Sequence, residues 1–215
     1  YAEVRSQIAA SARRLPADQA LSLTHALLTR EEDLDDPFLP LMLWWALDAQ
    51  ADHGREELLT LFDDPAFRKL PMVARHVLPR ILRRFALQGR RQDLLACARL
   101  LRLATDKAEA AKLLEGFEEA YQGRLMEGLP RELVAALAKV GRSSLTLRLR
   151  LGEPKAMAEA LAKVTDRKTL EAERLALVRS LGELKKPSAA PVLLALAFTD
   201  PPQSISLAQA ALAAL

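Results

Sequence analysis

The amino-acid sequence predicts an all-α protein built as a right-handed α-solenoid of antiparallel helix pairs, with about twelve helices. Three observations support this prediction. Half of the 215 residues are hydrophobic, glycine is rare (8), and no alternating apolar and polar run is long enough for a strand. Apolar stripes at helical spacing recur along the chain. The pentapeptide at residues 136–140 returns letter for letter at residues 160–164, which is an internal repeat.

The expected helices are apolar stripes bounded by proline, glycine and aspartate. In the first half of the chain they cover residues 4–15, 17–30, 37–47, 55–62 and 71–87. In the second half they cover residues 92–104, 107–121, 131–140, 145–151, 155–164, 169–184, 189–198 and 204–215. Asp64 followed by Pro65 adds a further helix-start signal. Pro79 should interrupt the helix at residues 71–87, because it cannot donate to the carbonyl of Arg75.

No break between these helices is long enough for a domain linker, so residues 1–215 are predicted to form a single repeat array. The chain opens on Tyr1 and closes on Leu215, each inside an apparent helix. We therefore expect it to be a fragment of a longer multidomain protein.

The helix at residues 37–47 is the expected centre of the core. It carries no charge, and Asp36 followed by Pro37 is a typical helix start. A helix that is apolar all round must be covered on every side, and this one is too short for a membrane span, which needs about 20 residues. The predicted core residues are Leu41, Leu43, Trp44, Trp45 and Leu47.

Charge is distributed unevenly along the chain. Residues 31–64 hold eleven acidic residues and one basic residue, whereas residues 65–102 hold ten basic residues and one acidic residue. We interpret this pattern as mutual neutralisation between adjacent helix pairs; a polyanion-binding surface is the alternative.

The basic helix supplies the candidate binding site. At about 100° per residue, several of its basic side chains fall away from or beside its apolar face. The candidate residues, for a polyanion or an acidic partner, are His76, Arg80, Arg83, Arg84, Arg90 and Arg91. If these side chains lie along the inner surface of the solenoid, they could bind phosphates or an acidic peptide. Helical-repeat DNA glycosylases combine such a surface with tryptophans, so an exposed Trp44 and Trp45 facing the arginines would favour nucleic-acid binding.

Chemistry-bearing motifs are absent from the sequence. The three histidines, His25, His53 and His76, have no ligand spacing, and Cys97 is the single cysteine. No nucleophile motif, phosphate loop or membrane span is present. We expect neither catalysis, nor a metal, nor a cofactor bound by this chain, nor membrane insertion by this segment.

Two resemblances give a more specific expectation. Residues 189–212, with Pro191, Asp200 and Ile205, resemble one HEAT repeat, and Val4-Arg5 resembles part of another. Residues 36–47, 113–124 and 149–153 are similar to the helical-repeat segment of large planctomycete-type haem-binding proteins, often labelled membrane-bound dehydrogenase-like. That family joins a propeller domain, a HEAT-like array and a c-type cytochrome domain, so the resemblance implies haem c only in a neighbouring domain and an exported, periplasmic protein.

The predicted function is therefore a non-catalytic scaffold or protein-interaction module whose partners are proteins or neighbouring domains. The resemblance implies a spacer between a propeller domain and a cytochrome c domain. The alternative is a nucleic-acid-binding HEAT-repeat protein of the DNA-glycosylase kind, acting through the basic helix at residues 75–91.

Overall fold

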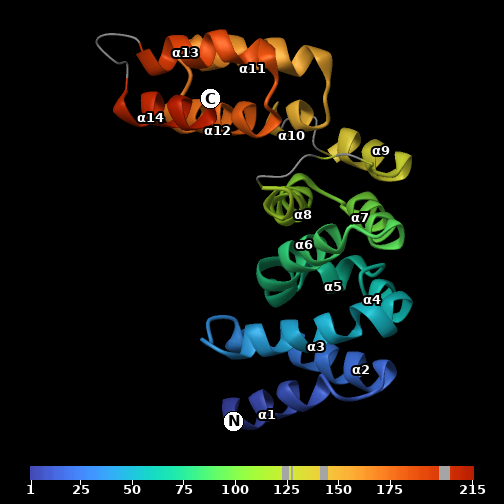
Figure 1. Ribbon diagram of the computed structural model, residues 1–215. Helices are drawn as coiled ribbons and strands as arrows, with labels where there is room; N and C mark the ends of the chain where they lie inside the picture. The colour runs from blue at the N-terminus through green and yellow to red at the C-terminus, as the bar shows by residue number, and fades with distance from the viewer. Residues whose placement is uncertain (123–125, 127, 141–144, 199–203) are drawn as a thin grey trace. The chain divides into compact units, whose positions relative to one another are not determined.

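The computed structural model describes residues 1–122, 126, 128–140, 145–198 and 204–215, and every regular element in them is a helix (Figure 1). The all-α prediction is confirmed. Fourteen α-helices are described, against the roughly twelve expected. They are α1 (Ala2–Ala12), α2 (Ala17–Leu28), α3 (Leu39–His53), α4 (Arg55–Leu61), α5 (Pro65–Lys69), α6 (Leu78–Gln88), α7 (Arg91–Leu103), α8 (Lys107–Ala120), α9 (Arg131–Val140), α10 (Leu145–Arg150), α11 (Pro154–Thr165), α12 (Glu171–Leu184), α13 (Ala190–Phe198) and α14 (Ile205–Ala214). Short 3₁₀ turns lie at Glu31–Asp33 and Pro187–Ala189.

The helices group into two compact units. Unit 1 comprises Tyr1–Ala120 with Pro130–Ala136, and unit 2 comprises Tyr121–Leu129 with Leu137–Leu215.

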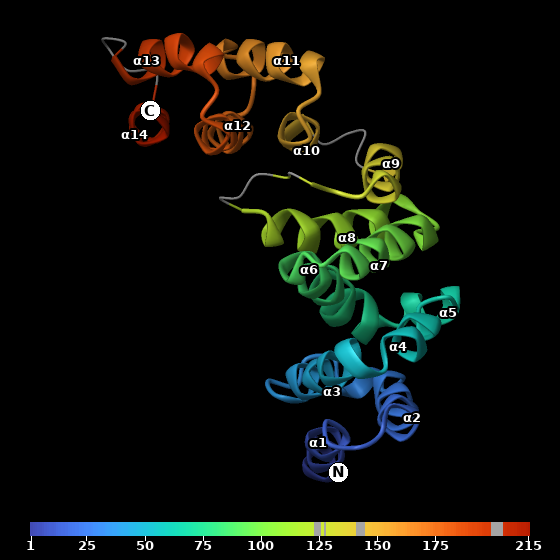
Figure 2. The ribbon, with the colours of Figure 1, turned by 45° about the vertical axis from the view of Figure 1, so that its right-hand side comes forward.

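In unit 1 the packing follows the order of the chain. Helix α3 packs on both α1 and α2, and α6 packs on both α7 and α8 (Figures 1 and 2). The largest fully buried side chains include Phe62, Phe85 and Phe117, which come from the end of α4, from α6 and from α8. Most helix contacts of unit 1 join a helix to the next one or the one after it, so its core is largely a sequence of local contacts.

Unit 2 has two layers. Helices α11 and α13 form one layer, and α10, α12 and α14 form the other (Figures 1 and 2). Its core is made of leucine, alanine and valine, with Ala156, Ala160, Val164, Leu177 and Leu181 almost completely buried. Small side chains let neighbouring helices of one layer approach closely. Gly182 is an example, because a Cβ at this position would lie 2.6 Å from the Cβ of Ala214 in α14.

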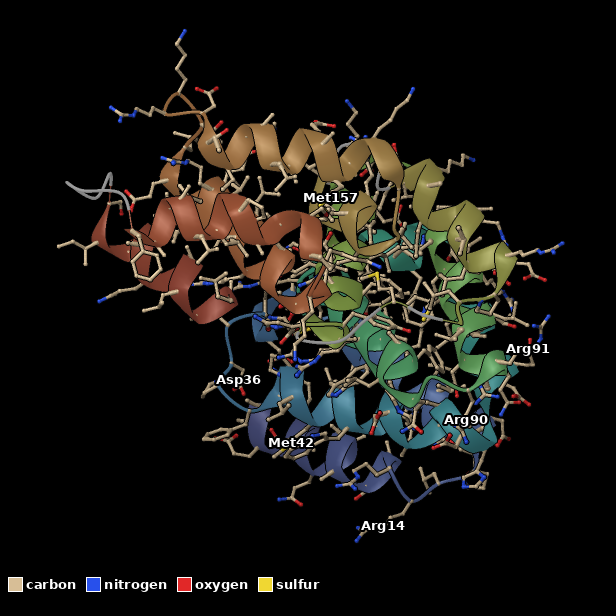
Figure 3. The ribbon with its side chains drawn as sticks, turned by 45° about the horizontal axis from the view of Figure 1, so that its top comes forward. Arg14, Asp36, Met42, Arg90, Arg91 and Met157 are labelled. Carbon is tan, nitrogen blue, oxygen red and sulfur yellow. The ribbon has the colours of Figure 1, made fainter. Side chains whose placement is uncertain are left out.

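Helix α3 begins at Leu39, two residues later than the sequence predicts. The carboxylate of Asp36 (labelled in Figure 3) still caps this start, since Oδ1 accepts from the backbone N–H of Phe38 at 2.9 Å and from that of Leu39 at 2.8 Å. These bonds hold the pKa of Asp36 below its usual value, the bond from Leu39 contributing most. The second predicted start is confirmed, since Asp64 accepts from Ala66 N–H at the first turn of α5.

The expectation that α3 is covered on every side is wrong. Leu43 and Leu47 are fully buried, as predicted for the core, but Leu41 and Trp45 are 39% and 43% exposed, and Trp44 is only partly buried. Residues four positions apart share one face of a helix, so Leu41 and Trp45 form a single exposed stripe. Helices α1, α2 and α4 pack on α3 and leave this stripe open.

The interruption predicted at Pro79 takes the form of a π-turn at Val73–Val77, just before α6. The N–H of Leu78 donates to the carbonyl of Val73, five residues earlier, instead of four. This wider turn accommodates a proline whose ring would otherwise collide with a helical carbonyl. Val73, Val77, Ile81 and Phe85, at fourfold spacing, are all buried.

Candidate functional site

A groove between α3 and α6, within unit 1, brings the tryptophan pair and three of the six candidate basic residues together. Its volume is about 310 Å³. Helix α3 supplies Leu41, Trp44, Trp45 and Asp48, and helix α6 supplies Arg80, Arg83, Arg84, Leu87 and Gln88. We call this the α3–α6 groove.

One part of the groove is apolar. Trp45 and Leu41 are exposed, as described above, and Leu87 across the groove is 46% exposed. The guanidinium of Arg13, which follows α1, lies 5.9 Å from the centre of the Trp45 ring. A cation over an indole face is attracted by the ring quadrupole, so this contact restrains Trp45.

Arg84 forms the floor of the polar part. Its side chain is only 12% exposed, and it donates from Nε to Asp48 at 2.9 Å and from Nη2 to Asp52 at 2.6 Å. Its Nη1 is buried without a hydrogen-bond partner in the described part of the chain. Arg84 therefore ties α6 to the acidic side of α3 and has little freedom to reach a ligand.

Arg83 is exposed and Arg80 is partly buried. Arg80 donates from Nη1 to the carbonyl of His76 at 2.6 Å, and no described carboxylate lies within ion-pair distance of it. Arg83 pairs with Glu119 of α8 at 3.1 Å, and both side chains are about half exposed. Exposed pairs of this kind contribute little stability, so a competing carboxylate can replace Glu119.

The other three candidate residues lie outside this groove. The Nε2 of His76 lies 3.1 Å from the carbonyl of Leu34. Arg90 donates to Asp52 at 2.5 Å and to Asp93 at 2.6 Å, and both bonds raise the pKa of Arg90. Arg91 is exposed at the start of α7 (Figure 3) and has no ion pair with a described residue.

Ion pairs join the acidic stretch at residues 31–64 to the basic stretch at residues 65–102, as the neutralisation interpretation predicts. They link Asp35 with Arg75, Asp48 and Asp52 with Arg84, Asp52 with Arg90, and Glu56 and Asp63 with Arg99. Arg90 also holds the pKa of Asp52 below its usual value, with Arg84 acting in the same direction.

The sequence prediction of the site missed Arg13, Asp48 and Leu87. Asp48 lies four residues after Trp44, and Leu87 lies four residues after Arg83, so helical spacing alone places each on the same face as a candidate residue. Arg13 gives no such signal, because it reaches Trp45 only through the packing of α1 on α3.

His76 makes the stability of the protein depend on pH. Burial lowers its pKa, and the nearby cations of Arg80 and Arg75 act in the same direction. Below about pH 6.5 the unfolded chain therefore binds more protons at this residue than the folded chain, and the free energy of unfolding falls as the pH drops.

We expect the loss in the free energy of unfolding between about pH 7.5 and about pH 5 to be smaller in His76→Gln than in the native protein. Urea unfolding at the two pH values measures it, and the other titrating groups cancel in the comparison. An equal loss in both proteins would contradict the role of His76.

The geometry thus defines a small groove with an aromatic wall and two cations, Arg80 and Arg83, that no buried carboxylate among the described residues holds. Comparison of the chain with family models, with curated proteins and with solved structures found no match. Within the described ranges, no group of three or more histidine, cysteine, aspartate or glutamate side chains is arranged to hold a metal ion. The described helices include none with the length and hydropathy that crossing a membrane requires.

Proposed function

We propose that this chain is a non-catalytic protein-interaction scaffold, a right-handed α-solenoid of HEAT-like helix pairs. The observation that carries the proposal is the order of packing in each unit. In unit 2, α10 packs on α11 and α12, α11 packs on α12 and α13, and α14 packs on α12 and α13. Contacts of helices with near neighbours in the chain, one or two helices away, are typical of stacked helical repeats.

A repeated arginine–carboxylate link supports the same proposal. Arg5 pairs with Asp33, Arg55 with Asp93, Arg68 with Glu109, and Arg150 with Glu183. The partners are 28, 38, 41 and 33 residues apart. Three of these separations lie within the length of one helical repeat, about 33–47 residues, and the fourth, between Arg5 and Asp33, is shorter. Links of this length are suited to fix one helix pair on the next.

The resemblance to the planctomycete-type haem-binding proteins extends the proposal. It makes this chain the spacer between a propeller domain and a c-type cytochrome domain, with haem bound by the neighbouring domain. Within this chain Cys97 is a core residue, because it is completely buried and its thiol donates to the carbonyl of Leu82 at 3.7 Å. A haem Soret band and a Cys-x-x-Cys-His motif in the full-length protein would support the spacer role, and their absence would contradict it.

Nucleic-acid binding is the second candidate, favoured by one observation: Trp45 is exposed beside Arg80 and Arg83. The neighbouring charges disfavour it. A protein binds nucleic acid when its free cations neutralise phosphates and release the counterions of those phosphates. Arg84 and Arg90 are not free, because each forms ion pairs with two carboxylates. We therefore rank the protein-interaction scaffold first.

Hydrogen exchange of the full chain tests the repeat scaffold. In such a scaffold each helix pair contacts only its neighbours, so a local defect should stay local. Gly182→Ala brings a Cβ to 2.6 Å from the Cβ and 2.7 Å from the Cα of Ala214. We expect faster exchange in α12 and α14, with protection unchanged in α1–α3; Lys168→Ala, in an exposed turn, is the control.

An equal loss of protection in α1–α3 and in α14 would contradict a scaffold of locally stacked pairs, because it would mean that the whole chain unfolds as one cooperative unit.

A further inference from the structure

We propose that the α3–α6 groove is the docking site for an acidic segment of a partner protein, which inserts one large apolar side chain between Trp45 and Leu87. This inference rests on the proposed scaffold function and adds where the partner binds and what its chemistry is.

The apolar part of the groove fits a single anchoring side chain. Leu41, Trp45 and Leu87 together expose apolar surface from the two helices that line the groove. Tryptophan and arginine are the residue types most enriched among those that dominate the energy of protein interfaces. The volume of about 310 Å³ lies at the small end of the range for ligand sites, about 300–1,000 Å³.

The charges of the groove select an acidic segment. Three arginines and one aspartate line the groove, and the aspartate, Asp48, is already paired with Arg84. Arg80 has no carboxylate partner among the described residues, and Arg83 has only the exposed Glu119. Arg80 and Arg83 are three residues apart on α6, so their side chains are neighbours on one face, about 5–6 Å apart at Cβ. Two carboxylates of an incoming segment can pair with them.

Arg13 completes the site from a third element. Its guanidinium lies over Trp45, and it has no ion pair with a described carboxylate. It therefore restrains the indole on which the anchor packs and adds a third cation at the edge. A partner with basic residues would meet only cations at these three positions.

Selection from a random peptide library displayed on phage, with the full chain as bait, tests this inference. We expect the selected peptides to combine two or more acidic residues with an aromatic or large aliphatic residue. A selected peptide, labelled with fluorescein, is then titrated with the native chain and with variants. Trp45→Ser and the double variant Arg80→Gln with Arg83→Gln should each weaken binding about tenfold or more, the loss typical of an interface residue that dominates affinity.

Matched controls separate the groove from general effects. Arg91→Gln removes an exposed arginine outside the groove, and Phe198→Ser removes an exposed aromatic side chain in unit 2. Each control should leave the affinity within about twofold, a change well under 1 kcal/mol. Circular dichroism melting of every variant checks that it remains folded.

Three results would overturn the inference. Selected peptides without acidic residues would contradict the proposal that the arginines of the groove select an acidic segment. Acidic peptides whose binding is unchanged by the groove variants would place docking elsewhere and leave the scaffold proposal standing. A single-stranded oligonucleotide that binds more tightly than the peptides and is lost with the same variants would assign the groove to nucleic acid. The exchange experiment with Gly182→Ala judges the scaffold separately, so the two proposals can fail independently.

Discussion

Arg68→Ala is expected to lower the free energy of unfolding by about 3–5 kcal/mol, the range for breaking a buried ion pair. Arg68 is only 2% exposed, and its guanidinium pairs with the buried carboxylate of Glu109 in α8. It also donates to the carbonyl of Phe62 and, at 2.7 Å, to that of Leu103. The substitution leaves a carboxylate without its cation and three carbonyls, those of Phe62, Asp63 and Leu103, without this donor.

Urea denaturation measures this effect. Arg102→Ala is the matched control, because Arg102 is exposed and should change stability by less than about 0.5 kcal/mol. The double variant Arg68→Met with Glu109→Gln should be more stable than Arg68→Met alone, because the glutamine is neutral and can still accept from Thr105 N–H, which donates to Glu109 at 2.8 Å. A cost below about 1 kcal/mol for Arg68→Ala would contradict a structural role for the pair.

Gly116→Ala is expected to cost about 3 kcal/mol, although glycine to alanine inside a helix normally gains about 1 kcal/mol. A Cβ at residue 116 would lie 1.9 Å from the carbonyl oxygen and 2.7 Å from the carbonyl carbon of Pro79. These are backbone atoms of α6, so no side-chain rotation can relieve the overlap and the two helices must move apart.

The melting temperature and urea unfolding of Gly116→Ala check this expectation. Ala111→Gly, at an exposed position of the same helix, is the control and should lose about 1 kcal/mol through helix propensity alone. A variant Gly116→Ala that is more stable than the native protein would show that α6 and α8 do not approach this closely.

The helices were the most predictable part of the fold. Their ends coincide with residues that stop or start a helix for local reasons, such as Asp64 before Pro65 and Gly89, which follows α6 in a left-handed conformation. Such signals need no knowledge of the rest of the chain. The π-turn at Val73–Val77 could not be predicted in the same way. Pro79 indicates that the helix is interrupted, but it does not indicate the form of the interruption.

The exposure of Trp45 was less predictable. An uninterrupted apolar run shows that a helix is mostly buried, but it does not show which face the neighbours leave open. That face is set by α1, α2 and α4, which pack on the other sides of α3. Similarly, helical spacing placed Arg80, Arg83 and Arg84 near one another, whereas the carboxylates that bind Arg84 come from Asp48 and Asp52, more than thirty residues earlier in the chain.

The π-turn also bears on how the chain can vary in length. A π-turn is equivalent to one residue inserted into an α-helix, with the extra residue absorbed locally. Loss of one residue at Val73–Val77 would therefore leave Ile81 and Phe85 facing the core, but it would place Pro79 in a regular helix, where its ring collides with the carbonyl four residues earlier. Loss of one residue after Arg80 would rotate every later residue of α6 by about 100°, and would turn Arg83 away from Trp45. A deletion before the groove thus creates a local conflict at Pro79 and keeps the register of α6, whereas a deletion within the groove changes that register.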